Sequence, residues 1–75
     1  MQKQLARHVR QETRKLETLA SAVAQSTAPG SAHKLNELYA KIRRLNAVIR
    51  DILEASIDVV TRFFVRVFID RQPIL

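Results

Sequence analysis

The sequence contains no cysteine and no tryptophan, and it has only one glycine and two prolines among 75 residues. The absence of cysteine excludes disulfide bonds and thiolate metal ligands as means of stabilising so short a chain. The scarcity of glycine and proline, together with a hydrophobic content of 47%, argues against a linker or a disordered segment. We therefore expect an ordered, helix-rich protein.

The sequence also lacks a hydrophobic run of the roughly 18 residues that a membrane-spanning helix needs. Its most apolar stretch, residues 57–69, is interrupted by Asp58, Arg62 and Arg66. The first residues are polar and basic, and they lack the apolar core of a signal peptide. The sequence therefore predicts a cytoplasmic protein.

Acidic residues are few relative to basic ones, with 7 Asp and Glu against 13 Lys and Arg, so the formal net charge is +6. The excess is divided evenly, because residues 1–30 carry five basic and two acidic side chains and residues 31–75 carry eight and five. The sequence has no detached basic tail of the kind that often binds nucleic acid. A net positive charge nevertheless favours acidic partners such as nucleic acid, an anionic membrane or an acidic protein surface.

A chain of 75 residues forms one small domain, which we place at residues 1–75. A domain near this size buries only about 60% of its unfolded surface and is marginally stable when alone. Small scaffolds without disulfides or metals commonly gain their stability by association. We therefore expect a homo-oligomer or a subunit of a larger protein complex.

One apolar seam dominates the second half of the sequence. Its residues recur at alternating spacings of three and four, which is a heptad pattern and predicts a long helix with coiled-coil-like packing. Ser56 is the one polar interruption. The seam consists of Leu35, Leu38, Ile42, Leu45, Ile49, Ile52, Val59 and Phe63.

These patterns predict an all-α fold, an antiparallel helical hairpin. The first helix is expected at residues 3–26, the turn at 27–32 around Pro29 and Gly30, the second helix at 33–71 with Ser31 as its N-cap, and a short tail at 72–75. The alternation of β-branched and aromatic residues in 63–69 leaves a short edge strand as the alternative for that segment. The tail is either frayed or a short docking peptide.

The two predicted helices differ in length, so the second is expected to overhang the first. Helix one would cover helix two only to about residue 56, and the apolar face widens at this point. Such an uncovered apolar surface is typical of an interaction site. The expected oligomer or partner interface consists of Ile57, Val60, Phe63, Phe64, Val67 and Phe68.

A basic row runs along the first helix. It consists of Lys3, Arg7, Arg10 and Arg14, at spacings of four and three, so that the four side chains share one helix face. Cations at this spacing are candidates for phosphate contacts. The alternative interpretation is the solvated face of an amphipathic helix. No aromatic residue is interleaved with the row, so the sequence does not indicate a base-stacking platform.

The sequence contains no recognisable catalytic, cofactor-binding or metal-binding motif. His8 and His33 are expected at opposite ends of the hairpin, where they cannot meet within one chain. The acidic residues show no Glu-x-x-His arrangement of the kind that di-iron bundles use, and there is no glycine-rich phosphate loop. We therefore expect a non-enzymatic protein without a cofactor, a metal or a small-molecule substrate.

The sequence favours a small helical assembly, adaptor or scaffold subunit that associates through the apolar end of the second helix. The alternative is a small basic nucleic-acid-binding protein that dimerises through the second helix and contacts phosphates through the basic row. A third interpretation is a membrane-surface helix, in which Arg62 and Arg66 extend to the headgroups while the phenylalanines enter the interface.

Overall fold

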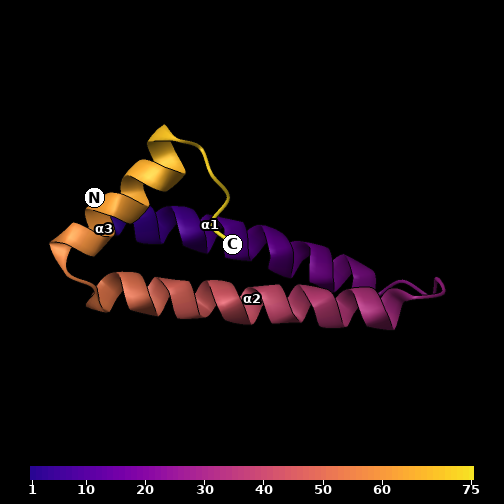
Figure 1. Cartoon of the computed structure of the whole chain (residues 1–75). Coiled ribbons are helices and arrows are strands. Elements are labelled where there is room, and N and C mark those ends of the chain that lie inside the picture. The colour runs from indigo at the N-terminus through magenta and orange to yellow at the C-terminus, as the bar shows by residue number, and fades with distance from the viewer.

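The computed structural model describes residues 1–75, and 80% of them are helical with no strand. The elements are α1 (Gln2–Ala24), α2 (Ser31–Glu54), α3 (Ile57–Phe64) and a single π-helical segment, η1 (Val65–Ile69). Helices α1 and α2 lie side by side and run in opposite directions (Figure 1). The predicted all-α hairpin is therefore confirmed.

The apolar faces of α1 and α2 form the core of the hairpin. Near the turn, Ala20, Leu38 and Ile42 are buried against one another, with Leu16, Val23 and Leu35 packed around them. Toward the other end of the hairpin, Leu5, Ala6 and Val9 of α1 pack with Leu45 and Ile52 of α2 in a larger buried cluster. The heptad spacing therefore predicts the buried face of α2 correctly as far as Ile52.

The turn between the helices is formed by residues 25–30. Gly30 has φ of 83° and is the N-cap of α2, one residue before the predicted cap Ser31. This left-handed conformation is readily adopted by glycine, which has no Cβ. The turn therefore uses the only glycine of the sequence.

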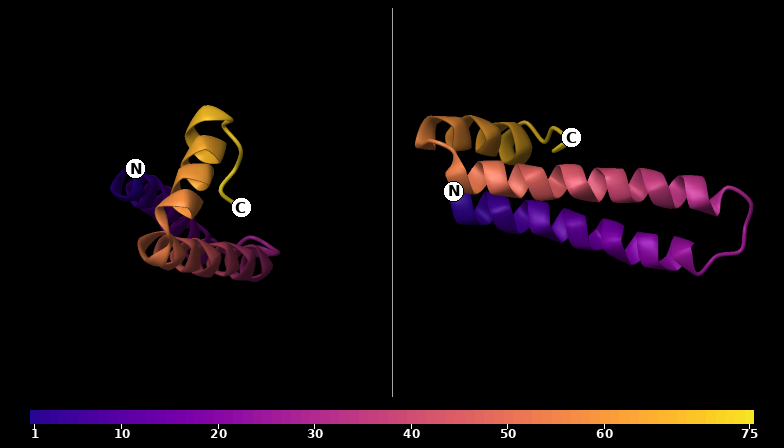
Figure 2. Two further views of the ribbon diagram at one scale, coloured as in Figure 1. Left: turned by 60° about the vertical axis from the view of Figure 1, so that its left-hand side comes forward. Right: turned by 90° about the horizontal axis from the view of Figure 1, so that it is seen from below.

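The second helix does not continue to residue 71, and this is the main correction to the sequence prediction. It ends at Glu54, and Ala55 and Ser56 adopt extended conformations with ψ of 155° and 159°. The chain then reverses direction, and α3 lies over the hairpin instead of overhanging it (Figures 1 and 2). The helix breaks close to residue 56, where coverage by α1 is expected to end, but the sequence predicts a continuous helix there and not a chain that folds back.

The break has a physical basis in the residues that follow it. Ser56 is the N-cap residue of α3, and Asp58 lies in the first turn of that helix, where its negative charge interacts favourably with the helix dipole. Folding back buries Val60 and Val67, which are only 4% and 7% exposed, in the same cluster as Leu5 and Val9. Burial of such side chains stabilises by about 1.5–3 kcal/mol each, which a protruding helix would forgo.

The break also shifts the phase of the apolar pattern. A continuous seam would place Val59 inward, but Val59 is 54% exposed, and the neighbouring Val60 is buried instead. The two extended residues rotate α3 so that a different set of side chains faces the core. The prediction that Val59 continues the seam is therefore wrong.

The end of the chain is helical up to Ile69 and then folds back along the molecule. The predicted helix at 63–69 is confirmed over the edge strand, although its last turn is a π-turn, in which the Asp70 N–H donates to the Val65 carbonyl at 2.9 Å. Arg71 has φ of 55° and redirects the tail. Ile74 packs against the core cluster, so the tail is a packed segment and not a frayed one.

A side-chain contact ties the start of α1 to the end of α2. The Gln2 amide nitrogen donates to the carbonyl oxygens of Ile52 and Leu53, at 2.9 and 3.0 Å. Carbonyls at a helix C-terminus have no partner within the helix. Gln2 therefore supplies a cap at the point where α2 must stop.

We expect Val67→Ala to lower the free energy of unfolding by about 2 kcal/mol, because it removes buried methyl groups and leaves a cavity. The matched control is Val65→Ala, since Val65 is solvent-exposed on the same segment; its effect should stay below about 0.5 kcal/mol. Chemical denaturation measures both. Equal effects of the two substitutions would contradict the folded-back position of η1.

Candidate functional site

The six residues of the predicted interface do not form one open surface. Val60 and Val67 are buried within the chain, and Phe63 and Phe64 are half-buried. Ile57 is 74% exposed and Phe68 is 38% exposed. The premise that this segment has no partner within its own chain is therefore wrong, because α1 and α2 already cover its inner side.

An aromatic cluster lies where η1 passes over α1. The rings of Phe64 and Phe68 have centroids 4.7 Å apart, and the His8 ring lies 5.0 Å from that of Phe68. These residues border a shallow hollow together with Gln4, Arg7 and Gln11 of α1. The cluster holds η1 against α1, and it gives His8 a packing role that the sequence did not indicate.

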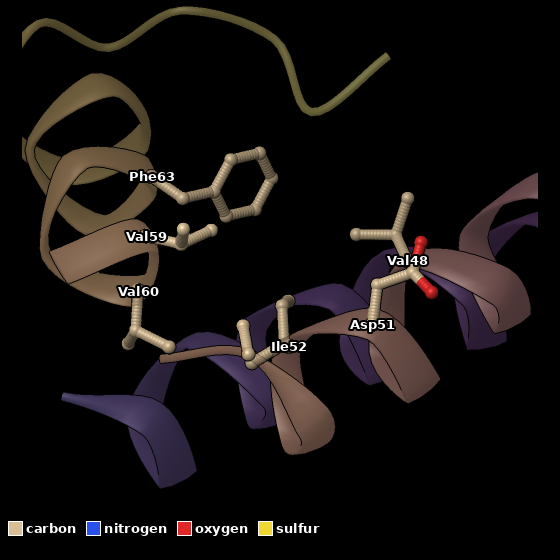
Figure 3. A pocket seen from close by; sticks show the side chains of 7 residues that line it. Val48, Asp51, Ile52, Val59, Val60 and Phe63 are labelled. Carbon is tan, nitrogen blue, oxygen red and sulfur yellow. The ribbon is translucent and has the colours of Figure 1, made fainter. Parts of the chain in front are cut away.

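An apolar groove separates α2 from α3. Its cavity volume is about 190 Å³, and Asp51 is its one polar lining residue. Figure 3 shows Val59, Val60 and Phe63 on α3, facing Val48 and Ile52 across the groove. The lining residues are Val48, Asp51, Ile52, Ala55, Val59, Val60 and Phe63.

Sequence reasoning missed this groove because it depends on the break. With α2 and α3 in one straight helix, Val48 and Val59 would lie far apart. The two extended residues bring them to opposite walls of the same groove. The signal that could have found it was Ser56, a preferred N-cap residue, followed by Asp58 in a position that favours a helix start.

The basic row stays together in the structure. All four of its side chains are exposed, and together with Ala6, Gln11 and Leu53 they line one concave surface with a volume of about 580 Å³. Arg10 and Arg14 also border an adjoining hollow between α1 and α2, where Asn46 and Ile49 form the other wall. The row therefore borders the junction of the two hairpin helices rather than an isolated helix face.

The charges of the basic row are not neutralised by nearby carboxylates. The chain has two ion pairs, Lys15 with Glu12 and His33 with Glu37, each at 3.1 Å, and neither includes a residue of the row. Glu17 is the one acidic residue that lines either hollow. The concave surface is consequently a concentrated positive region.

The structure does not bring the histidines together. His8 lies against Phe68, whereas His33 pairs with Glu37 in the first turns of α2 at the opposite end of the hairpin. No group of three or more His, Asp or Glu side chains is arranged to hold a metal ion. No helix combines the length and the hydropathy that a membrane span requires.

Comparison with protein-family models, with curated proteins and with solved structures found no match to this chain. The chain's own two surfaces, the apolar groove and the basic row, are therefore its candidate functional sites.

We expect the combined substitution of Arg7, Arg10 and Arg14 by Gln to leave the protein folded and to raise its free energy of unfolding by about 0.5–1 kcal/mol at low salt. Like charges three or four residues apart destabilise a helix, and no ion pair is lost. Thermal unfolding followed by circular dichroism measures the effect. If the free energy of unfolding instead fell by more than about 1 kcal/mol, the arginines would make stabilising contacts beyond the two ion pairs of the chain.

Proposed function

We propose that this protein is a non-enzymatic helical assembly or adaptor subunit that binds a second copy of itself through the apolar groove between α2 and α3. The observation that carries the proposal is the groove itself, an apolar surface left open after the chain has folded back on its own hairpin. The exposed Val59 of its wall and the exposed Ile57 of the adjoining hollow extend the apolar surface beyond the groove. Contiguous exposed apolar surface is typical of interaction sites.

The total exposed area supports association. The chain exposes 5579 Å². A compact monomer of 8.6 kDa is expected to expose about 4,700 Å², so the excess is roughly 900 Å². A standard protein–protein interface buries about 800 Å² on each partner. One interface of ordinary size would therefore bring the exposed surface to the level of a compact protein.

The size of the groove suits an apolar side chain. A dry cavity of about 150 Å³ holds a benzene ring, and the groove of about 190 Å³ is slightly larger. The exposed Val59 forms part of its outer wall. A large apolar side chain from a partner helix would fill the groove and cover Val59.

Two opposite charges near the apolar groove favour a second copy of the chain as its partner. Asp51 lies on the α2 wall of the groove, and the guanidinium of Arg66 in η1 lies 5.8 Å from the centroid of the ring of Phe63, which lines the opposite wall. Neither side chain has an ion-pair partner within the chain. In a two-fold symmetric dimer the same patch faces itself, so Asp51 of each copy can approach Arg66 of the other.

We expect Val59→Lys to convert a wild-type dimer to a monomer, because it places a charge on the apolar wall without removing a buried side chain. Leu19→Lys is the matched control, since Leu19 is a similarly exposed apolar residue on α1, outside the groove. Size-exclusion chromatography with light scattering measures the mass. A monomeric wild type, or dissociation by Leu19→Lys alone, would contradict the proposal.

The proposed pairing of Asp51 with Arg66 predicts a charge-reversal cycle. Asp51→Arg alone and Arg66→Asp alone should each weaken the dimer about tenfold, because each places like charges at the interface. The double variant should recover most of the wild-type affinity, since it restores opposite charges. Sedimentation equilibrium gives the dissociation constants, and additive losses in the double variant would refute the two-fold arrangement.

A further inference from the structure

The basic row on α1 is a second candidate binding surface, because its four positive charges have no ion-pair partners within the chain. Of the five basic residues of α1, Lys15 is paired with Glu12, and the other four form the basic row on a single concave surface. Holding four cations within three helical turns, with no carboxylate on the concave surface itself, is electrostatically unfavourable for the isolated chain. An anionic ligand would remove that cost.

The chemistry of the row favours phosphate. Three of its four residues are arginines, whose planar guanidinium groups bind phosphate oxygens through paired hydrogen bonds. Lys3 to Arg14 spans eleven residues, or about 16 Å of helix axis. A row of this length matches an extended polyanion with several phosphates better than a single small anion.

The shape and lining of the concave surface favour nucleic acid over a membrane as its ligand. A helix that lies on a membrane presents apolar side chains beneath its basic ones. The concave surface is lined mainly by basic and polar residues, with Ala6 and Leu53 as its apolar contributors. A curved, basic surface of this kind fits a nucleic-acid backbone better than a flat lipid surface.

We propose that the basic row binds the phosphodiester backbone of nucleic acid, without sequence preference. No aromatic residue lines the concave surface itself, and the hollow bordered by Phe64 and Phe68 adjoins it only at Arg7 and Gln11, so the four basic side chains are the main contacts that it offers to a ligand. The row and the apolar groove share no lining residue. This binding is therefore independent of the proposed association, and a dimer would present two such rows.

The test is the salt dependence of binding of the full chain to a 20-base-pair DNA duplex and to a 20-nucleotide RNA strand, measured by fluorescence anisotropy. Four phosphate contacts predict a slope of log K against log salt of about −3.6 for the duplex and about −2.8 for the single strand. For the duplex, affinity should fall about 150-fold between about 50 and 200 mM salt.

The decisive comparison uses two variants with the same change in net charge. Substituting Gln for Arg7, Arg10 and Arg14 should reduce the duplex slope to about −0.9, because only Lys3 remains. The control substitutes Gln for Lys34, Lys41 and Arg71, which are exposed and do not line the concave surface. The control should keep a slope near that of the wild type.

Three results would overturn the proposal. The first is no binding of the wild type to either nucleic acid at about 50 mM salt. The second is an equal loss of affinity in the two variants, which would indicate net charge and not the basic row. The third is binding to vesicles containing phosphatidylserine with none to nucleic acid. A monomeric wild type that binds the duplex with the expected slope would refute the association alone.

Discussion

The structure depends on the packing of α3 and η1 back onto the hairpin through Val60 and Val67. These two side chains join the cluster that contains Leu5, Val9 and Ile52, so residues from all three helices share one core. The hairpin alone would leave this apolar segment in water. Two extended residues, Ala55 and Ser56, make the reversal possible, and the Gln2 amide caps α2 just before it.

The same reversal determines which surfaces are available to other molecules. Val59 and Phe63 come to face Val48 and Ile52, which creates the apolar groove between α2 and α3 (Figure 3). The basic row lies on α1 outside that groove, where carboxylates are scarce. Two surfaces of different chemistry thus occur on a small chain, so self-association and polyanion binding need not compete for the same residues.

The sequence predicts the hairpin well because heptad spacing and the Pro29–Gly30 turn are local signals. It predicts that α1 covers α2 only to about residue 56, but it predicts neither the break of the helix there nor the reversal of the chain. The apolar pattern runs through Ser56 with one interruption, and periodicity alone favours a continuous helix. The reversal of the chain is stabilised by burial of Val60 and Val67 against α1. These contacts join residues that are distant in sequence, so a local pattern does not reveal them. The groove and the Gln2 cap follow from the reversal and were unpredictable for the same reason. The basic row is a local pattern on one helix, and its four side chains share one surface as expected, whereas their contact with phosphate stays a prediction.

The most direct test of this account is a nuclear Overhauser effect between the ring protons of His8 and Phe68, whose ring centroids lie 5.0 Å apart only if η1 returns to α1. The measurement should use uniformly labelled protein and, in parallel, an equal mixture of labelled and unlabelled chains with isotope filtering. We expect a cross-peak within single chains and interrupted helical connectivities at Ala55 and Ser56. A cross-peak only between different chains, or continuous helical connectivities from residue 50 to residue 64 without a contact to His8, would contradict it.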